Sequence, residues 1–326
     1  MNNSIQLLAK KIDHGERLDK FLSNKINLLT RSHIKKIIQV GNVTIDSQII
    51  KSASKKIKLG ELIKINLINN EVDNLYPSKI KIDICYEDKD IIIVNKPRGM
   101  VVHPGAGNIR NTLANALAYK YNNKLSNING KLRPGIVHRI DKETSGLLVV
   151  AKNNLSHSRL AKQFSDHSIK RSYLALTWGV IRPLNGKIVT LISRSRKNRQ
   201  LMAVSEISGK KAITNYKTLR VFNYSNIPKI SLIECILETG RTHQIRVHLS
   251  HKGNPLIGDK KYGKKKLQFK KINREFEKIL SNFERQALHA KSLGFFHPTK
   301  NKFVNFDSKL PVDFKKMLDF LEKFSN

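Results

Sequence analysis

The chain has 326 residues and carries 61 lysines and arginines against 25 aspartates and glutamates, for a formal charge of +36 and a pI near 10.2. It has no run of about 18 apolar residues that would predict a membrane span, and residues 1–11 lack the apolar core of a secretory signal. A chain this basic favours a polyanionic partner, and we expect nucleic acid rather than a membrane. Because lysine, isoleucine and asparagine codons are rich in A and T, part of the charge can also reflect genome composition.

The cysteines and histidines indicate a reducing compartment and no metal site. Cys85 and Cys235 stand alone in apolar, strand-like surroundings, which is typical of an intracellular protein, so we expect a cytoplasmic location. No cysteine–histidine cluster has zinc spacing, and His243 and His248 are flanked by arginines. The sequence therefore predicts no bound metal.

The N-terminal part predicts two short helices. The first has the i, i+3, i+4 spacing of a buried face at Leu18, Phe21 and Leu22. The second is expected to begin near Thr30 as N-cap and to end with Gly41 as the C′ glycine. Its apolar face consists of Ile34, Ile37 and Ile38, and its other face carries the basic residues Arg31, Lys35 and Lys36.

Two strands are expected after these helices, at 43–45 and 62–67, with a turn at Asp46 and Ser47. The order of helices and strands, with Arg-Leu-Asp-x-Phe-Leu at 17–22 and Lys-x-Gly-Glu at 58–61, resembles the S4-like RNA-binding module. That resemblance implies a domain over residues 14–75, with Arg31 and Lys35 as RNA contacts. For the basic residues alone, a solvated helix face is an equally good explanation. Residues 69–79 are polar and aperiodic and predict a linker.

The remainder of the chain predicts an α+β domain over residues 80–326. Short apolar runs at 83–86, 91–95, 146–150 and 231–237 indicate strands, and helical stretches are expected around 111–121, 154–166 and 243–252. Interleaved strands and helices favour a central mixed or antiparallel sheet. Residues 260–278 are rich in lysine and fit either a phosphate-facing insertion or a solvated loop.

The stretch His138-Arg139-Ile140-Asp141-Lys142-Glu143-Thr144-Ser145-Gly146 precedes the apolar run Leu147–Ala151. A carboxylate held by a turn at the start of a buried strand loses little freedom when it attacks a substrate, so Asp141 is a candidate nucleophile. The alternative is a strand-entry turn in which the aspartate only caps the backbone.

This stretch resembles the signature of the RluA family of pseudouridine synthases, with Ile140 in place of a leucine. Four further segments match that family in order: 86–107, which contains Asn-Lys-Pro and His-Pro-Gly-Ala-Gly; Lys-Arg-Ser-Tyr-Leu-Ala at 170–175; Arg-Thr-His-Gln-Ile-Arg at 241–246; and Gln-Ala-Leu-His-Ala at 286–290. The resemblance implies isomerisation of uridine to pseudouridine, in which the glycosidic bond breaks and the base is rejoined through carbon 5. No redox or phosphoryl step occurs, so no cofactor is expected.

The family resemblance also assigns roles to individual residues. Asp141 attacks C1′ or acts as a base at the sugar, and Arg246 keeps its carboxylate ionised. Tyr173 stacks on the uracil and takes the C5 proton, while Ile245 packs beneath the base. Because the base must leave its stack, Arg139 is the expected wedge in the vacated space, with a phosphate contact as the alternative. His103 is expected to contact RNA or to support the fold.

The combination of motifs is most similar to family members that act on the helix 69 stem-loop of 23S ribosomal RNA. We therefore expect a monomer that binds 23S ribosomal RNA, the large ribosomal subunit or its precursor. Two alternatives remain. The same chemistry can take place at another 23S or transfer RNA site, or the chain can be a non-catalytic RNA-binding assembly factor. The intact set Asp141, Tyr173 and Arg246 favours an enzyme.

Overall fold

The computed structural model describes residues 3–26, 31–67, 75–105, 107–224, 227–263 and 274–323. The chain divides into two compact units, residues 1–73 and 74–326. Within the described ranges, no helix is both long and apolar enough to cross a membrane. The expected N-cap Thr30 and residues 264–273 of the lysine-rich segment lie outside these ranges.

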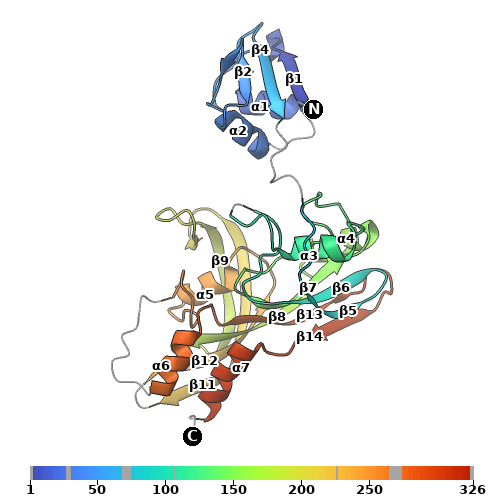
Figure 1. The fold of residues 1–326 in the computed structure, drawn as a ribbon. Helices are drawn as coiled ribbons and strands as arrows, with labels where there is room; N and C mark the ends of the chain where they lie inside the picture. The colour runs from blue at the N-terminus through green and yellow to red at the C-terminus, as the bar shows by residue number, and fades with distance from the viewer. Residues whose placement is uncertain are drawn as a thin grey trace. The chain divides into compact units, whose positions relative to one another are not determined.

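The first unit is a small antiparallel sheet with two helices (Figure 1). Both expected helices and both expected strands are present. The sheet order is β1-β4-β2-β3. The first strand of the sheet, β1, and the short strand β3 were not predicted from the sequence. The elements are β1 (Asn3–Leu8), a short 3-10 helix (Lys11–Asp13), α1 (Leu18–Lys25), α2 (Arg31–Gln39), β2 (Val43–Ile45), β3 (Gln48–Ile49) and β4 (Leu62–Leu67).

The helix faces of this unit are buried as their spacing predicted. Leu18, Phe21 and Leu22 of α1 and Ile34, Ile37 and Ile38 of α2 enter one apolar core. Gly41 has a positive φ of 83°. Its N–H bonds to the carbonyl of Ile38 at 3.0 Å, and the next N–H, of Asn42, bonds to that of Ile37 at 3.1 Å. This pair of bonds ends the helix and requires the left-handed conformation that glycine adopts without strain.

The second unit is built on a ten-stranded mixed sheet, in agreement with the expected α+β class. Its order is β10-β9-β11-β12-β8-β13-β7-β6-β5, and β14 pairs with β13. The described pairings are antiparallel except for β13 with β7. The strands are β5 (Asp83–Glu87), β6 (Ile91–Lys96), β7 (Ser145–Ala151), β8 (Lys170–Trp178), β9 (Asn185–Arg194), β10 (Met202–Ser205), β11 (Lys210–Tyr224), β12 (Ile227–Leu237), β13 (Leu288–Phe296) and β14 (Phe303–Asp307).

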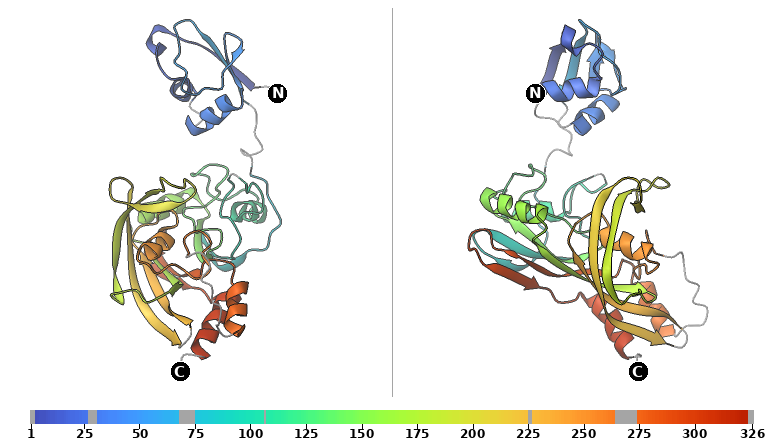
Figure 2. Two further views of the ribbon diagram at one scale, coloured as in Figure 1. Left: turned by 90° about the vertical axis from the view of Figure 1, so that its left-hand side faces the viewer. Right: turned by 180° about the vertical axis from the view of Figure 1, so that it is seen from behind.

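The described helices of this unit are α3 (Leu113–Lys120), α4 (Asn154–Ser165), α5 (Gln244–His251), α6 (Arg274–Asn282) and α7 (Val312–Lys323). The first three were predicted from the sequence. Strand β7 is buried on both faces, because Leu148 shares a core with Leu113 of α3, whereas Leu147 shares another with Leu160 of α4. Figure 2 shows β9, β11 and β12 bending around α5.

Gly146 lies where β7 and β13 run parallel, and this close approach requires a glycine. It pairs with Ala290 and has a φ of 113°. A Cβ at this position would lie 2.2 Å from the carbonyl oxygen of Ala290. The Thr-Ser-Gly sequence therefore serves the junction of two strands, because only a residue without a side chain lets their backbones meet.

Beside this junction, His289 forms hydrogen bonds to two serines, Ser145 and Ser308. One ring nitrogen contacts Ser145 Oγ at 2.9 Å and the other contacts Ser308 Oγ at 2.8 Å. Burial lowers the pKa of His289 to about 4. The unfolded chain takes up this proton near pH 6.5 but the folded protein does not. Stability is therefore lost as the pH falls from about 6.5 to about 4.

We predict that His289→Gln, which cannot titrate, will flatten the pH dependence of the free energy of unfolding by about 3 kcal/mol between pH 7 and pH 4. Urea unfolding at several pH values measures this slope. The exposed His251→Gln is the matched control and should leave the slope unchanged. An unaltered slope in His289→Gln would show that this histidine does not carry the pH dependence.

Candidate active site

A cleft of about 300 Å³ in the second unit collects most of the candidate residues from distant parts of the chain. Asp141 comes from the loop before β7, Tyr173 from β8, and Ile245 and Arg246 from α5. Arg139 also lines the cleft, and His103 contacts Arg139. The remaining candidates, Arg31 and Lys35, belong to the first unit.

Buried side chains tie the Asp141 loop to the rest of the unit. Lys96 is fully buried, and its Nζ donates to the carbonyls of Pro97, Met100 and Lys142 at 2.7 to 3.0 Å. Burial lowers the pKa of Lys96 to about 7. Arg285 Nη1 donates to the carbonyl of Glu143 at 3.3 Å. These bonds fix the backbone beside Asp141, so its carboxylate needs little ordering before it reacts.

The start of α5 is set by Gln244. Its amide Nε2 donates to the Ile213 carbonyl and the Thr214 hydroxyl of β11 at 2.9 and 3.0 Å. Its Oε1 accepts from the Thr239 hydroxyl and the Arg241 N–H at 2.8 and 2.9 Å. A buried amide with all these partners fixes the direction in which the helix leaves the sheet. The next two residues of the same turn, Ile245 and Arg246, then line the cleft.

Arg246 is shared between two carboxylates. Its Nη1 donates to Asp141 Oδ2 at 2.9 Å, as expected, and its Nε and Nη2 donate to the two oxygens of Asp259 at 2.8 and 2.9 Å. Burial alone favours the neutral guanidine, but the bonds and charges of Asp259 and Asp141 outweigh it and raise the pKa of Arg246. Because Arg246 reaches Asp141 through one N–H only, it leaves Asp141 Oδ1 for other partners.

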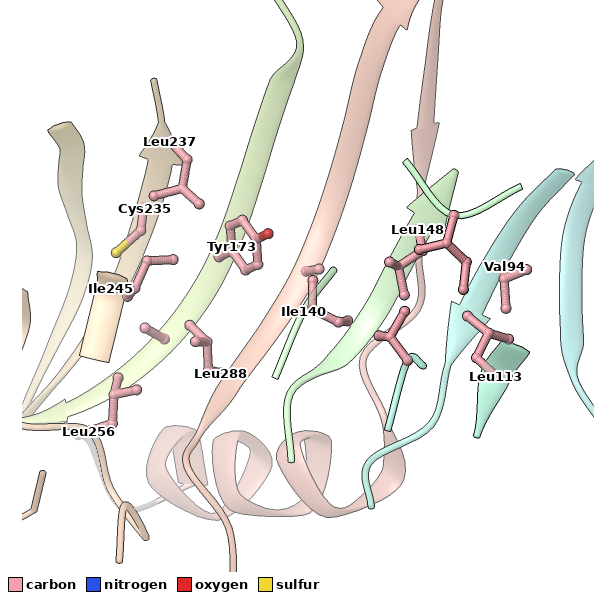
Figure 3. Close-up of a cluster of buried hydrophobic side chains, with 14 of the residues drawn as sticks. Val94, Leu113, Ile140, Leu148, Tyr173, Cys235, Leu237, Ile245, Leu256 and Leu288 are labelled. Atoms are coloured by element: carbon pink, nitrogen blue, oxygen red, sulfur yellow. The ribbon is translucent and has the colours of Figure 1, made fainter. Parts of the chain in front are cut away.

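Tyr173 and Ile245 form the apolar wall of the cleft. Both are buried and belong to one core cluster with Leu237 and Leu288. Figure 3 shows Ile245, Leu237 and Leu288 around the tyrosine ring. Burial, with a contribution from the Asp141 charge, raises the pKa of Tyr173 despite the opposing effect of Arg171. The site therefore offers a flat ring with a neutral phenol at neutral pH.

Arg139 and His103 pair at the exposed side of the cleft. Arg139 Nη1 lies 3.2 Å from His103 Nε2, and His103 Nδ1 lies 3.1 Å from the Pro104 carbonyl. An arginine can only donate, so the imidazole accepts at Nε2 and carries its proton on Nδ1. Burial lowers the pKa of His103, which fits this neutral form. Because the neutral His103 forms no ion pair with Arg139, the positive charge of the guanidinium is not compensated by this contact.

Comparisons with known proteins agree with this geometry. Residues 90–251 match the family model described as RNA pseudouridylate synthase, and residues 16–63 match the S4 domain. The chain is 45% identical over 311 residues to ribosomal large subunit pseudouridine synthase D of Zymomonas mobilis, covering 94% of both proteins. It is 40% identical over 321 residues to the uncharacterized RNA pseudouridine synthase YlyB of Bacillus subtilis, covering 98% of this chain and 99% of that protein.

The chain belongs to the RluA family of RNA pseudouridine synthases. A solved structure, human RNA pseudouridylate synthase domain containing 4, matches with a TM-score of 0.54 and 27% identity over 74% of this chain and 93% of that one. The described fold, a small S4 sheet and a large mixed sheet, is the one that the family resemblance implied.

Two residues that were not predicted from the sequence contact the candidate site. Asp259 holds the far side of Arg246, and the Tyr262 hydroxyl lies 2.8 Å from His243 Nδ1. His243 Nε2 in turn lies 3.9 Å from Asp141 Oδ1. The available signal was the sequence Gly-Asp-Lys-Lys-Tyr-Gly at 258–263, in which a lone acid stands among lysines. Its partner is 13 residues away, which no helix or strand spacing indicates.

The synthase also places one group of possible metal ligands outside this cleft. Asp88, Asp90 and His297 bring ligand atoms within 4.8 Å of one another. Asp88 already accepts hydrogen bonds from Lys300 Nζ and two backbone N–H groups, and Asp90 accepts one from Thr299 Oγ1. These donors account for the arrangement of the carboxylates without an ion.

In the S4 unit, Arg31 has an intramolecular partner. Its guanidinium contacts Asp19 at 3.0 Å, and Arg17 contacts the same carboxylate at 3.0 Å. The Arg31 side chain is nevertheless 53% exposed, and Lys35 is exposed on the same helix. The exposed part of α2 therefore keeps positive charge at the surface.

We predict that Asp259→Asn will lower the free energy of unfolding by about 3 kcal/mol and reduce isomerisation, because Arg246 loses the charge of its fully buried partner and keeps only the partly exposed Asp141. Urea unfolding and a single-turnover assay measure the two effects. The control Asp166→Asn breaks an exposed pair with Lys162 and should cost under about 0.5 kcal/mol. Equal losses in the two variants would contradict the assigned role of Asp259.

Proposed function

We propose that this RNA pseudouridine synthase isomerises uridines in the helix 69 stem-loop of 23S ribosomal RNA, with Asp141 as the catalytic carboxylate. The observation that carries the chemistry is the Asp141–Arg246 pair, at 2.9 Å, in the cleft that Tyr173 and Ile245 also line. Asp141 acts at the sugar, either by attack on C1′ or as a base.

The environment of Asp141 supports this role. Its side chain is only 18% exposed, and Arg246 neutralises the side of the carboxylate that faces the interior. The remaining oxygen, Oδ1, can approach the sugar of a nucleotide that has left its stack.

Tyr173 and Ile245 are the residues that we assign to the uracil. A planar base fits between the tyrosine ring and the isoleucine, where stacking and apolar contact hold it without fixing its rotation. Such freedom is needed because the freed base must turn before carbon 5 reaches C1′. We assign the C5 proton to the Tyr173 hydroxyl, which as a neutral phenol passes its own proton on to solvent in the cleft as it accepts this one.

The choice of target rests on the relatives and on the S4 domain. Relatives that match nearly the full chain include synthases named for the large ribosomal subunit, in Zymomonas mobilis and in Haemophilus influenzae at 38% identity. The net charge of +36 and the exposed basic residues of α2 fit binding to folded, phosphate-rich RNA.

We predict that cells lacking this gene will lose pseudouridine in helix 69 and that Asp141→Asn will not restore it, because the amide keeps the size of the side chain without its charge. Chemical mapping of pseudouridine in total RNA tests this, with the wild-type chain as the control. Loss at another 23S or transfer RNA site would reassign the target. Full restoration by Asp141→Asn would contradict the catalytic role.

We predict that Arg139→Ala will slow reaction most where the target uridine is stacked and paired, and least where it is already unstacked. Arg139 is assigned to fill the space of the departed base, and extrusion costs a few kcal/mol only from a stacked position. Single-turnover rates on a stem uridine and a loop uridine measure the difference. An equal loss on both, with a shallower salt dependence, would indicate a phosphate contact instead.

A further inference from the structure

Arg171 is a buried cation without a carboxylate partner. It is 7% exposed, and among the described residues its guanidinium has no hydrogen bond or ion pair, with Nε both buried and unbonded. The guanidinium makes a cation–π contact with Phe164, with Cζ 5.4 Å from the centre of the ring. By contrast, Arg246 and Arg285 each have a bidentate aspartate. Burying an uncompensated charge is costly, so this arrangement calls for a functional explanation.

Arg171 lines the same cleft as Asp141. The guanidinium lies against Gly240, where a Cβ would come within 2.6 Å of Nη1. The absence of a side chain at this glycine therefore leaves room for the arginine. The donors of Arg171 consequently border the space that a substrate enters.

The position of Arg171 relative to Tyr173 follows from β8. The two residues are two positions apart on one strand, so their side chains project to the same face roughly 6.6 Å apart along the strand. Across the sheet, Leu174 and Ser145 both pair with His289 of β13, whereas Arg171 pairs with Leu293, further along that strand. Because the Asp141 loop enters the sheet at Ser145, Tyr173 lies between that loop and Arg171 along β8.

From this order we infer that Arg171 donates hydrogen bonds to the carbonyl oxygen at the far edge of the flipped uracil and stabilises the ring when it leaves as an anion. This inference rests on the proposed function, which places the sugar at Asp141 and the base on Tyr173. With N1 bound to the sugar at Asp141, the opposite edge of the ring carries C4 and O4, and that edge faces Arg171.

Uracil has a carbonyl group on each side of N3, so Arg171 can donate to a carbonyl oxygen in both the substrate and the product. When the C1′–N1 bond breaks, its electron pair leaves with the ring, and the negative charge is shared between O2 and O4. The ring then turns about its N3–C6 axis, the C1′–C5 bond forms, the C5 proton is lost and N1 gains a proton. This turn exchanges O4 for O2 at the far edge, so Arg171 meets a carbonyl oxygen throughout.

The same contact distinguishes uracil from cytosine. Cytosine carries an amino group at C4, and a guanidinium has only donors. A cytidine flipped into this cleft would place two donors against each other in a buried site and leave both unsatisfied, which is heavily penalised. Arg171 is therefore also the residue that we assign to base specificity.

The test combines Arg171→Met with substitution of single atoms in the RNA. Stem-loops of helix 69 carry uridine, 4-thiouridine or 2-thiouridine at the target position, and sulfur is a weak acceptor. The Arg171→Met change should lower the single-turnover rate on uridine roughly 10- to 100-fold, as expected for a bond from a charged donor, with little change in Kd. In the wild type, 4-thiouridine should react about tenfold more slowly than uridine, and in Arg171→Met this effect should disappear.

Four controls separate the outcomes. The effect of 2-thiouridine on cleavage of the glycosidic bond should be equal in both proteins, because O2 faces Arg171 only after the freed ring has turned. Arg171→Met should not lower the free energy of unfolding, since it removes an uncompensated buried charge. Arg220 is an exposed arginine that pairs with Glu322 outside the cleft. Arg220→Met should therefore change neither the rate on uridine nor the rate on 4-thiouridine. Arg171→Lys keeps a charged donor and should retain a 4-thio effect.

An undiminished 4-thio effect in Arg171→Met would overturn the inference. So would a loss confined to Kd with a shallower salt dependence, which would make Arg171 a phosphate contact. If the wild type does not react with the helix 69 stem-loop, the proposed target is wrong. The same comparison is then made on the RNA segment that the pseudouridine map identifies.

Discussion

The active site depends on one buried guanidinium held by two carboxylates. Arg246 uses two of its N–H groups for Asp259 and one for Asp141. The pair with Asp259 anchors the cation, so Asp141 gains a permanent positive neighbour yet keeps an oxygen for the substrate. Arg246 can occupy this place only because Gln244 fixes the start of its helix against β11. The hydrogen bond between Arg246 and Asp141 thus depends on the packing of a helix on a sheet.

The second requirement is a rigid backbone beside the reactive carboxylate. The loop of Asp141 leads into β7, which runs parallel to β13, and Gly146 lets these strands approach. Lys96 and Arg285 bond to carbonyls of the two residues that follow Asp141. Long cationic side chains satisfy backbone acceptors in places that water cannot reach. The backbone of the loop is therefore held by side chains that belong to other parts of the unit.

Positive charge has different functions on the surface and in the interior of this protein. At the surface, exposed groups such as Lys35 add to a field that attracts RNA of any sequence. In the interior, each cation has a specific set of acceptors, as Lys96 has with three carbonyls and Arg246 with two carboxylates. Arg171 is the exception, and a substrate carbonyl would supply the acceptor that the protein does not. The exposed and the buried basic residues thus differ in whether the protein itself supplies their acceptors.

The amino-acid sequence alone determined the elements whose signals are local. The spacing of Leu18 and Phe21 predicted a helix face, and the apolar run after Gly146 predicted a strand buried on both sides, because side-chain periodicity follows directly from backbone geometry. The family motifs identified Asp141 and its partner Arg246. Only the tertiary structure decided that Asp259 shares that arginine, that Gly146 serves a strand junction and that Arg171 stands unpaired in the cleft. These are contacts across the sheet, and no local spacing encodes which distant residue will lie opposite.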